Sequence, residues 1–258
     1  MAATAKDILA QIKEKDVKYV DVRFTDIRGK MQHVTFDIDL VDDDFLTDGT
    51  MFDGSSIAGW KAINESDMKL RPDLDSAIID PFYQQTTMAL FCDVVNPDTG
   101  TPYDRDPRSI AKSALNFVKA SGIGDTVYFG PEAEFFVFDD VRWSVQPNNT
   151  GYSYDSVELP INSAKEYEEG NMGHRPGPKG GYFPVNPVDS AQDLRGEMLA
   201  VMGELGMKPE KHHHEVAPAQ HELGLKFDTM IVMADRMQLY KYVIQNVAHA
   251  YGKTATFM

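Results

Sequence analysis

The chain has 258 residues, of which 42% are hydrophobic and 25% are charged, a composition typical of globular proteins that fold in water. Its net charge of −15 argues against a nucleic-acid partner, because phosphate binding needs clustered Lys and Arg, and equally against an anionic membrane surface. No apolar run has the length of a membrane-spanning helix, and the N-terminus lacks the basic and then apolar order of a signal peptide. With a single cysteine, Cys92, this pattern predicts a cytoplasmic protein with no membrane partner.

The first hundred residues contain one predicted helix and several predicted strands. Thr4 and Asp7 resemble a capping box, and apolar residues recur behind them at helical spacing, so a helix is expected over residues 4–18. Beyond it lie a turn at Gly29 and a loop over 42–60 that is rich in Gly and Asp. Strands are expected at 19–25, 31–36, 68–71, 77–80 and 87–94. One helix with several short strands predicts a small α+β domain.

Residues 96–102 are predicted to be a linker, and the predicted elements after them belong to a second part of the chain. Asp106 followed by Pro107 is typical of a helix start. The apolar face of that helix is expected to consist of Ile110, Ala114, Phe117 and Val118. Residues 142–181 are rich in Gly, Pro, Asn and Tyr and predict a long irregular loop. Two further helices are predicted, at 190–205 and 229–250.

Two carboxylates, Glu132 and Glu134, are two residues apart in a run rich in Phe and Val. On a strand, residues i and i+2 point to the same face roughly 7 Å apart, and carboxylates aimed the same way repel unless a cation lies between them. A solvent-facing strand with two harmless glutamates is the alternative. Because Phe136 and Phe138 continue the same face, the sequence favours a divalent-cation site at the end of a strand.

A second acidic cluster lies further along the chain. Residues 210–215 are expected to form a strand on which Glu215 shares its face with His213, and Glu222 follows beyond a turn that contains Pro. Carboxylates that converge from separate segments suit Mg²⁺ or Mn²⁺, which prefer oxygen ligands. A zinc or nickel site at the triple histidine, residues 212–214, is less favoured, because three consecutive rings on a strand cannot face one way.

Several segments resemble glutamine synthetase of the bacterial type, in the order found in that family and over nearly the whole chain. They are residues 51–57 (MFDGSSI), 130–136 (GPEAEFF), 179–185, 188–190, 212–222 and 253–258. Two departures are Asn186, where the family often has a second proline, and a loop from Glu215 to Glu222 that is one residue shorter than in enterobacterial relatives. The resemblance implies an α+β fold: a small β-grasp domain over 1–103, then the first part of an α+β catalytic domain with a curved antiparallel sheet over 104–258.

The resemblance also implies an activity, that of a glutamate–ammonia ligase that forms ADP. Such an enzyme joins ammonia to the side-chain carboxylate of L-glutamate through a γ-glutamyl phosphate and releases L-glutamine, ADP and phosphate. The chain contains no Walker motif, so ATP as a substrate follows from the resemblance alone. Mg²⁺ or Mn²⁺, two or more ions per site, would lie against the phosphate oxygens.

Roles for single residues follow from the same resemblance. Glu134, Glu215 and Glu222 match ligands of the metal on the glutamate side, and Glu132 matches a ligand of the metal on the ATP phosphates. The positions that match nucleotide contacts are Glu210 and Phe227.

The ammonium pocket is the second set of matched positions. Asp53 would bind ammonium and accept its proton, a task for which a carboxylate is chemically suited. An ordinary Asx turn before glycine is the alternative for this aspartate. The other matched positions around ammonium are Tyr182, Glu215 and Ser56.

The resemblance implies a homo-oligomer, a homododecamer of two stacked rings with each active site between neighbouring subunits. Asp53 is then expected to lie far from Glu132 within one chain. Family members continue well past Met258, so this chain is expected to be an N-terminal portion that is inactive alone.

Three alternatives remain open. A sister ligase that joins glutamate to a polyamine or another amine would share the metal carboxylates and differ in the ammonium pocket, where Asp53 and Tyr182 favour ammonia. A non-catalytic truncated subunit would assemble with full-length subunits without activity. A two-metal hydrolase would explain the carboxylates but not the loop at Asp53.

Overall fold

The computed structural model describes residues 2–159, 161 and 173–257. The chain divides into two compact units, residues 1–128 with 229–235 and residues 129–228 with 236–258. The predicted domain boundary at 103/104 stays a prediction. Within the described residues, no helix combines the length and the apolar character needed to span a bilayer.

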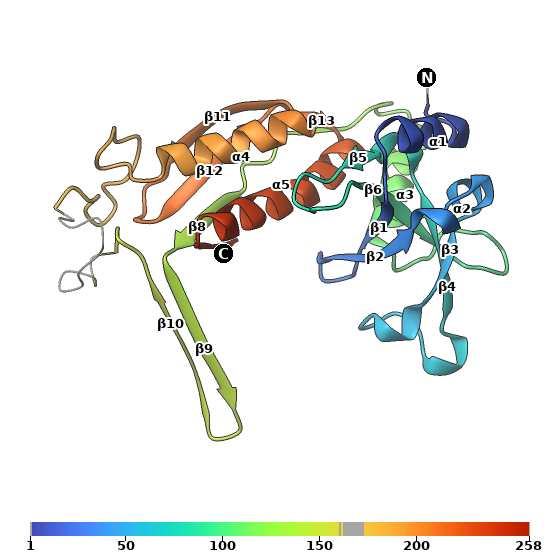
Figure 1. Ribbon diagram of the computed structural model, residues 1–258, viewed down its shortest axis with the longest axis horizontal. Coiled ribbons are helices and arrows are strands. Elements are labelled where there is room, and N and C mark those ends of the chain that lie inside the picture. Colours follow the sequence, from blue (N-terminus) through green and yellow to red (C-terminus); the bar gives the residue numbers. More distant parts are fainter. Residues whose placement is uncertain (1, 160, 162–172, 258) are drawn as a thin grey trace. The chain divides into compact units, whose positions relative to one another are not determined.

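The first unit is built around a mixed sheet with helices before, between and after its strands in the chain (Figure 1). Its helices are α1 (Ala5–Glu14), α2 (Asp43–Thr47) and α3 (Pro107–Ser121). Its strands are β1 (Tyr19–Thr25), β2 (Met31–Asp37), β3 (Thr50–Asp53), β4 (Asp67–Pro72), β5 (Ile78–Ile79) and β6 (Thr87–Val95). The strand order is β2-β1-β6-β4-β3, with β5 paired to β6; β1 and β6 run parallel, and the other pairs run antiparallel.

The helix predicted at the N-terminus is confirmed, with its capping box. The Thr4 hydroxyl accepts a hydrogen bond from the Asp7 amide, and the Asp7 carboxylate accepts one from the Thr4 amide. The helix ends at Glu14, earlier than predicted, because Asp16 adopts a φ of 52° and the Val17 amide donates back to the Ile12 carbonyl. This turn returns Val17 to the core. That core consists mainly of Ile8, Ile12, Val20, Val22, Met68, Leu70, Met88 and Leu90.

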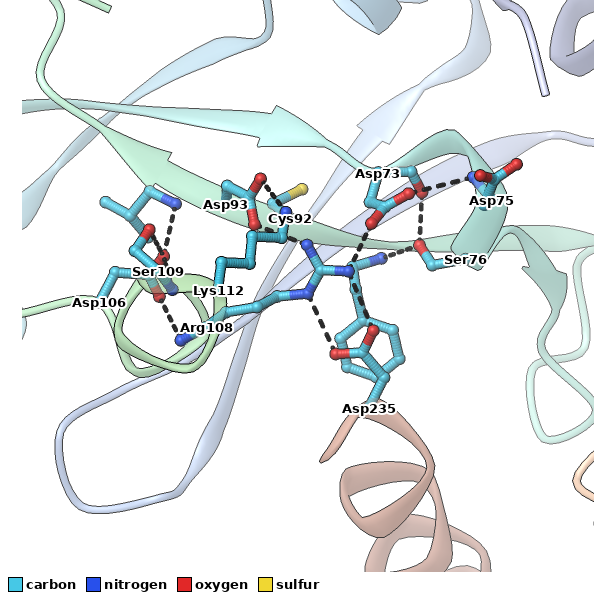
Figure 2. Close-up of polar contacts among 12 residues, drawn as sticks. Asp73, Asp75, Ser76, Cys92, Asp93, Asp106, Arg108, Ser109, Lys112 and Asp235 are labelled. Carbon is cyan, nitrogen blue, oxygen red and sulfur yellow. Dashed lines mark hydrogen bonds and ion pairs between the residues drawn. The ribbon is translucent and has the colours of Figure 1, made fainter. Parts of the chain in front are cut away.

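A buried ion cluster joins α3 to the sheet of the first unit (Figure 2). The Asp106 carboxylate caps α3 by accepting from the amides of Arg108 and Ser109, and it also accepts from the Val94 amide of β6. The Arg108 guanidinium donates to three carboxylates: Asp73 at 2.5 Å, Asp93 at 2.6 Å and Asp235 at 3.0 Å. The sequence pattern at Asp106-Pro107 therefore marks a helix start and also a tertiary anchor.

The apolar face predicted for α3 is not buried within the described residues. Ile110 is 54% exposed and Phe117 is 74% exposed. The periodicity gave the right helix, but it could not indicate whether a partner covers that face.

The second unit is built on an antiparallel four-stranded sheet of order β11-β12-β8-β14. Its strands are β8 (Glu134–Phe138), β9 (Asp140–Gln146), β10 (Asn149–Asp155), β11 (Pro209–His214), β12 (Gln220–Leu225) and β14 (Thr254–Thr256). Helix α4 (Gln192–Glu204) belongs to this unit, as does α5 (Met230–Ala250) from Arg236 onward. Two short strands, β7 (Tyr128–Phe129) and β13 (Asp228–Thr229), lie where the chain passes between the units. The α+β class predicted from the sequence is confirmed.

Two expectations for the second unit are wrong in part. The irregular loop predicted over 142–181 begins with an antiparallel hairpin, β9 and β10, in which Trp143 is the register partner of Tyr152. Alternation of apolar and polar residues along β9 decides this structure, and the Gly and Asn content of the segment concealed it. Residues 160 and 162–172 of the predicted loop lie outside the described residues. The second error concerns Glu132, which precedes β8 instead of lying on it.

Candidate active site

Three neighbouring strands place a row of potential ligands on one face of the second sheet. Glu134 of β8 is the register partner of Glu222 of β12, and Glu222 is in turn the partner of His213 of β11. Residues directly opposite each other in an antiparallel pair project to the same side of the sheet. The pairing register therefore brings together two carboxylates and one imidazole that are far apart in the sequence.

His213, Glu215 and Glu222 form a cluster of potential metal ligands. One ligand atom from each lies within 4.8 Å of the others. His213 Nδ1 is 3.4 Å from Glu215 Oε1, and His213 Nε2 is 3.7 Å from Glu222 Oε2. Such a set of two carboxylates and one imidazole can hold a divalent cation.

The Glu222 carboxylate gives the clearest local indication of a cation. Its Oε1 atom is buried and has no hydrogen-bond partner among the described residues. Burial raises the pKa of Glu222, and the nearby carboxylates of Glu132 and Glu215 raise it further, against the opposing effect of His213. A buried, unpartnered carboxylate oxygen among other carboxylates is costly unless a positive charge compensates it, so these residues fit a divalent metal.

The other two predicted metal ligands are less enclosed. Glu134 is exposed, and one of its oxygens accepts a hydrogen bond from the Gln220 side-chain amide. Glu132 is also exposed, in the segment before β8. Its negative charge contributes to the raised pKa of Glu222. Their metal-binding roles stay predictions.

His213 is not among the metal ligands predicted from the sequence. Its shared face with Glu215 is predicted, but a zinc or nickel site at residues 212–214 is disfavoured, because three consecutive rings cannot face one way. The structure separates the three rings: His212 accepts from Arg195 at 3.2 Å, and His214 lies 2.7 Å from Glu158. Only His213 lies among the candidate ligands, and its i, i+2 spacing to Glu215 was the signal that could have identified it.

A buried glutamate holds the loop that carries Glu215. Glu158 Oε2 accepts from the Ala219 amide at 2.6 Å and lies 2.7 Å from His214 Nε2, while His214 Nδ1 is 2.6 Å from the Glu215 carbonyl. Burial alone would raise the pKa of Glu158, but the hydrogen bond and charge of His214 lower it to about 2. The sequence offered no local signal for Glu158, because it contacts this loop only in the folded chain.

Tyr182 lies beside the cluster on a closely packed loop. The Gly181 amide donates to the Val216 carbonyl at 3.1 Å, and the Tyr182 ring lies edge-on to His213 with centroids 5.9 Å apart. A Cβ atom on Gly181 would lie 2.5 Å from the Glu215 carbonyl oxygen, so only glycine allows this approach. The Tyr182 side chain is 57% exposed, and its predicted role at ammonium stays a prediction.

The two positions matched to nucleotide contacts lie on the surface of the second unit. Glu210 is exposed near the start of β11, and the Phe227 side chain is 57% exposed just after β12. Both are accessible to a ligand.

Asp53 and Ser56 belong to the first unit. Asp53 ends β3 and caps a short 3₁₀ turn: its Oδ1 accepts from the Ser55 hydroxyl at 2.6 Å and the Ser55 amide at 2.8 Å, and Ser56 Oγ lies 3.4 Å from Oδ2. The hydrogen bond from the Ser55 side chain is the main reason that the pKa of Asp53 is lowered. This is the Asx-type turn of the alternative interpretation, and it keeps an exposed carboxylate charged, as cation binding requires.

Comparison with known proteins points to one family. The model of the glutamine synthetase catalytic domain matches residues 104–258, and that of the glutamine synthetase beta-Grasp domain matches residues 16–97. Glutamine synthetase of Bradyrhizobium diazoefficiens is 67% identical over 99% of the chain and 54% of its own length, and that of Azorhizobium caulinodans is 64% identical over the same shares. The cryo-EM structure of Plasmodium falciparum glutamine synthetase superposes with a TM-score of 0.90 at 27% identity, over 99% of this chain and 50% of that one. The chain thus spans about half the length of the relatives it matches.

Proposed function

Because the chain belongs to the glutamine synthetase family, we propose that it contributes to an ATP-dependent ligase that joins ammonia to the side-chain carboxylate of L-glutamate. The reaction proceeds through a γ-glutamyl phosphate and gives L-glutamine, ADP and phosphate. The convergence of His213, Glu215 and Glu222 around a buried, unpartnered carboxylate oxygen is the observation that carries the proposal. The proposed domains are residues 1–103 and 104–258, and the proposed location is the cytoplasm.

Two or more divalent ions, Mg²⁺ or Mn²⁺, are proposed as cofactors. Glu134, Glu215 and Glu222 would hold the ion on the glutamate side, and Glu132 would contact the ion on the ATP phosphates. When bound, such ions neutralise phosphate charge and orient the transferred group. Glu210 and Phe227, both accessible, are the proposed nucleotide contacts.

Asp53, Ser56, Tyr182 and Glu215 are the proposed ammonium pocket. The lowered pKa of Asp53, due chiefly to the Ser55 hydroxyl, supports a role in holding a cation. As the proton acceptor, Asp53 would convert bound ammonium to ammonia, the nucleophile that attacks the acyl phosphate.

A glutamine-formation assay tests this function. The chain is assayed alone and co-expressed with the part of the Bradyrhizobium relative that lies beyond the matched region, with ATP, glutamate and Mg²⁺. We expect ammonia-dependent release of glutamine only from the co-expressed pair, and loss of that activity with Glu215→Gln but not with Glu204→Gln, an exposed control. Preference for a polyamine over ammonia would favour the sister ligase, and an inert chain that still assembles with the full-length relative would favour a non-catalytic subunit.

We further propose a homo-oligomer, with two stacked rings and sites shared between subunits. The β9–β10 hairpin (Figure 1) supports self-association, because one of its faces is apolar and exposed. Trp143 is 75% and Tyr152 79% exposed, and the two are register partners. A two-stranded ribbon is marginally stable in water by itself, so an apolar face of this kind calls for a covering partner.

Charges on the apolar face of the hairpin test the oligomer. We expect Trp143→Lys with Tyr152→Lys to lower the assembled mass measured by analytical ultracentrifugation, because a buried contact would gain two unpaired charges. Ser144→Lys with Ser153→Lys, which lie on the opposite face of the same hairpin, are the matched control and should leave the mass unchanged. Equal masses for both pairs would exclude the hairpin from the interface.

A further inference from the structure

One buried tyrosine bridges the two segments that carry three of the candidate ligands. Tyr240 lies on α5 in the second unit and is 1% exposed. Its hydroxyl donates to the Ala133 carbonyl at 2.7 Å and accepts from the Leu223 amide at 3.3 Å. Ala133 lies between Glu132 and Glu134, and Leu223 follows Glu222 directly.

The bridge lies where the strand pairing stops. The register of β12 with β8 runs from Gln220 opposite Phe136 to Glu222 opposite Glu134 and ends there. The next residues outward, Leu223 and Ala133, form no ladder pair and are joined through the Tyr240 hydroxyl.

The last pair of that ladder is electrostatically unfavourable. Glu134 and Glu222 are like charges directly opposite each other, an arrangement that destabilises strand pairing. No direct pair of β8 and β12 continues the ladder beyond these two residues, so the Tyr240 hydroxyl supplies the next hydrogen bonds between the two segments. Burial raises the pKa of Tyr240, so its hydroxyl stays protonated and remains a donor to Ala133.

We propose that Tyr240 is a positioning residue that holds the backbone of Glu132, Glu134 and Glu222 at the separation that a divalent cation needs. This inference rests on the proposed function, because it presupposes a metal at these carboxylates. Tyr240 does not touch the metal, and it acts through the carbonyl of Ala133 and the amide of Leu223. Mutation of a group that hydrogen-bonds near metal ligands and orients them commonly lowers metal affinity by about 10- to 100-fold.

Mn²⁺ binding to the 258-residue chain tests the proposal, measured by titration and by the electron paramagnetic resonance spectrum of the bound ion. Tyr240→Phe removes one oxygen atom and keeps the ring in place. We expect it to weaken Mn²⁺ binding by about tenfold and to broaden the spectrum, because the carboxylate positions become less defined. Ile244→Val, a fully buried position one turn along the same helix, is the control for loss of stability alone and should keep both the affinity and the spectrum.

The outcomes separate this inference from the proposed function. Equal Mn²⁺ affinity and spectrum in Tyr240→Phe and the unsubstituted chain would overturn the positioning role while leaving the metal site intact. An equal loss in Tyr240→Phe and Ile244→Val would also overturn it, since general destabilisation would then explain both. An unsubstituted chain that binds no Mn²⁺ would overturn the metal site and this inference together.

Discussion

Replacing Arg108 by methionine is expected to destabilise the first unit by about 3–5 kcal/mol, the cost of removing one partner from a buried ion pair. The Arg108 side chain is 7% exposed and its guanidinium pairs with three aspartates, of which the Asp93 and Asp235 side chains are at most 17% exposed (Figure 2). Without it, these carboxylates would face one another. Among the described residues, Lys112, which pairs with Asp93, would be the cation that remains in the cluster. Urea unfolding followed by Trp60 fluorescence, in a Trp143→Phe background, reports on this unit alone.

Lys112 provides the matched control for that measurement. It also pairs with Asp93, but it is 38% exposed, so Lys112→Met should cost less than about 1 kcal/mol, as partly solvated ion pairs do. If Arg108→Met costs no more than Lys112→Met, the cluster is hydrated and contributes little to the fold. Adding Asp235→Leu to Arg108→Met should restore part of the stability, because it removes a buried charge that has lost its partner.

Glu222→Gln is expected to have opposite effects on metal binding and on stability. It removes a candidate ligand from the His213, Glu215 and Glu222 cluster, so Mn²⁺ affinity should fall by more than the roughly 10- to 100-fold typical of outer groups. With the metal removed by a chelator, however, the free energy of unfolding of the variant should exceed that of the unsubstituted chain by about 1 kcal/mol. The reason is that the substitution removes a buried charge that faces other carboxylates. Titration with Mn²⁺ and urea unfolding in chelator measure the two effects.

Glu204→Gln controls for the loss of a negative charge elsewhere in the second unit. Glu204 is an exposed residue at the end of α4, and its substitution should change neither the metal affinity nor the stability measurably. A Glu222→Gln chain that binds Mn²⁺ normally would contradict the metal site. One that is less stable in chelator would instead mean that the Glu222 carboxylate is satisfied in the metal-free fold.

Local sequence signals were sufficient wherever neighbours along the chain decide the structure. The capping box of Thr4 and Asp7, the cap at Asp106 and the periodic helices are confirmed, because helix starts and amphipathic faces depend on residues three or four apart. The acidic segments around Glu134, Glu215 and Glu222 were identified from their composition and their resemblance to a family. What those signals could not provide was the pairing register that places Glu134 opposite Glu222.

Contacts between distant segments decided the remainder, and they leave no periodic trace in the chain. Glu158 reaches His214 across 56 positions, and Tyr240 reaches Ala133 across 107, so neither partner could be identified from local spacing. The hydrogen bonds that fix His212 and His214, to Arg195 and Glu158, belong to the same class. The residue types along this chain therefore determine which chemical groups are available. Long-range strand pairing and buried hydrogen bonds determine which of those groups lie close together, because only folding brings them within bonding distance.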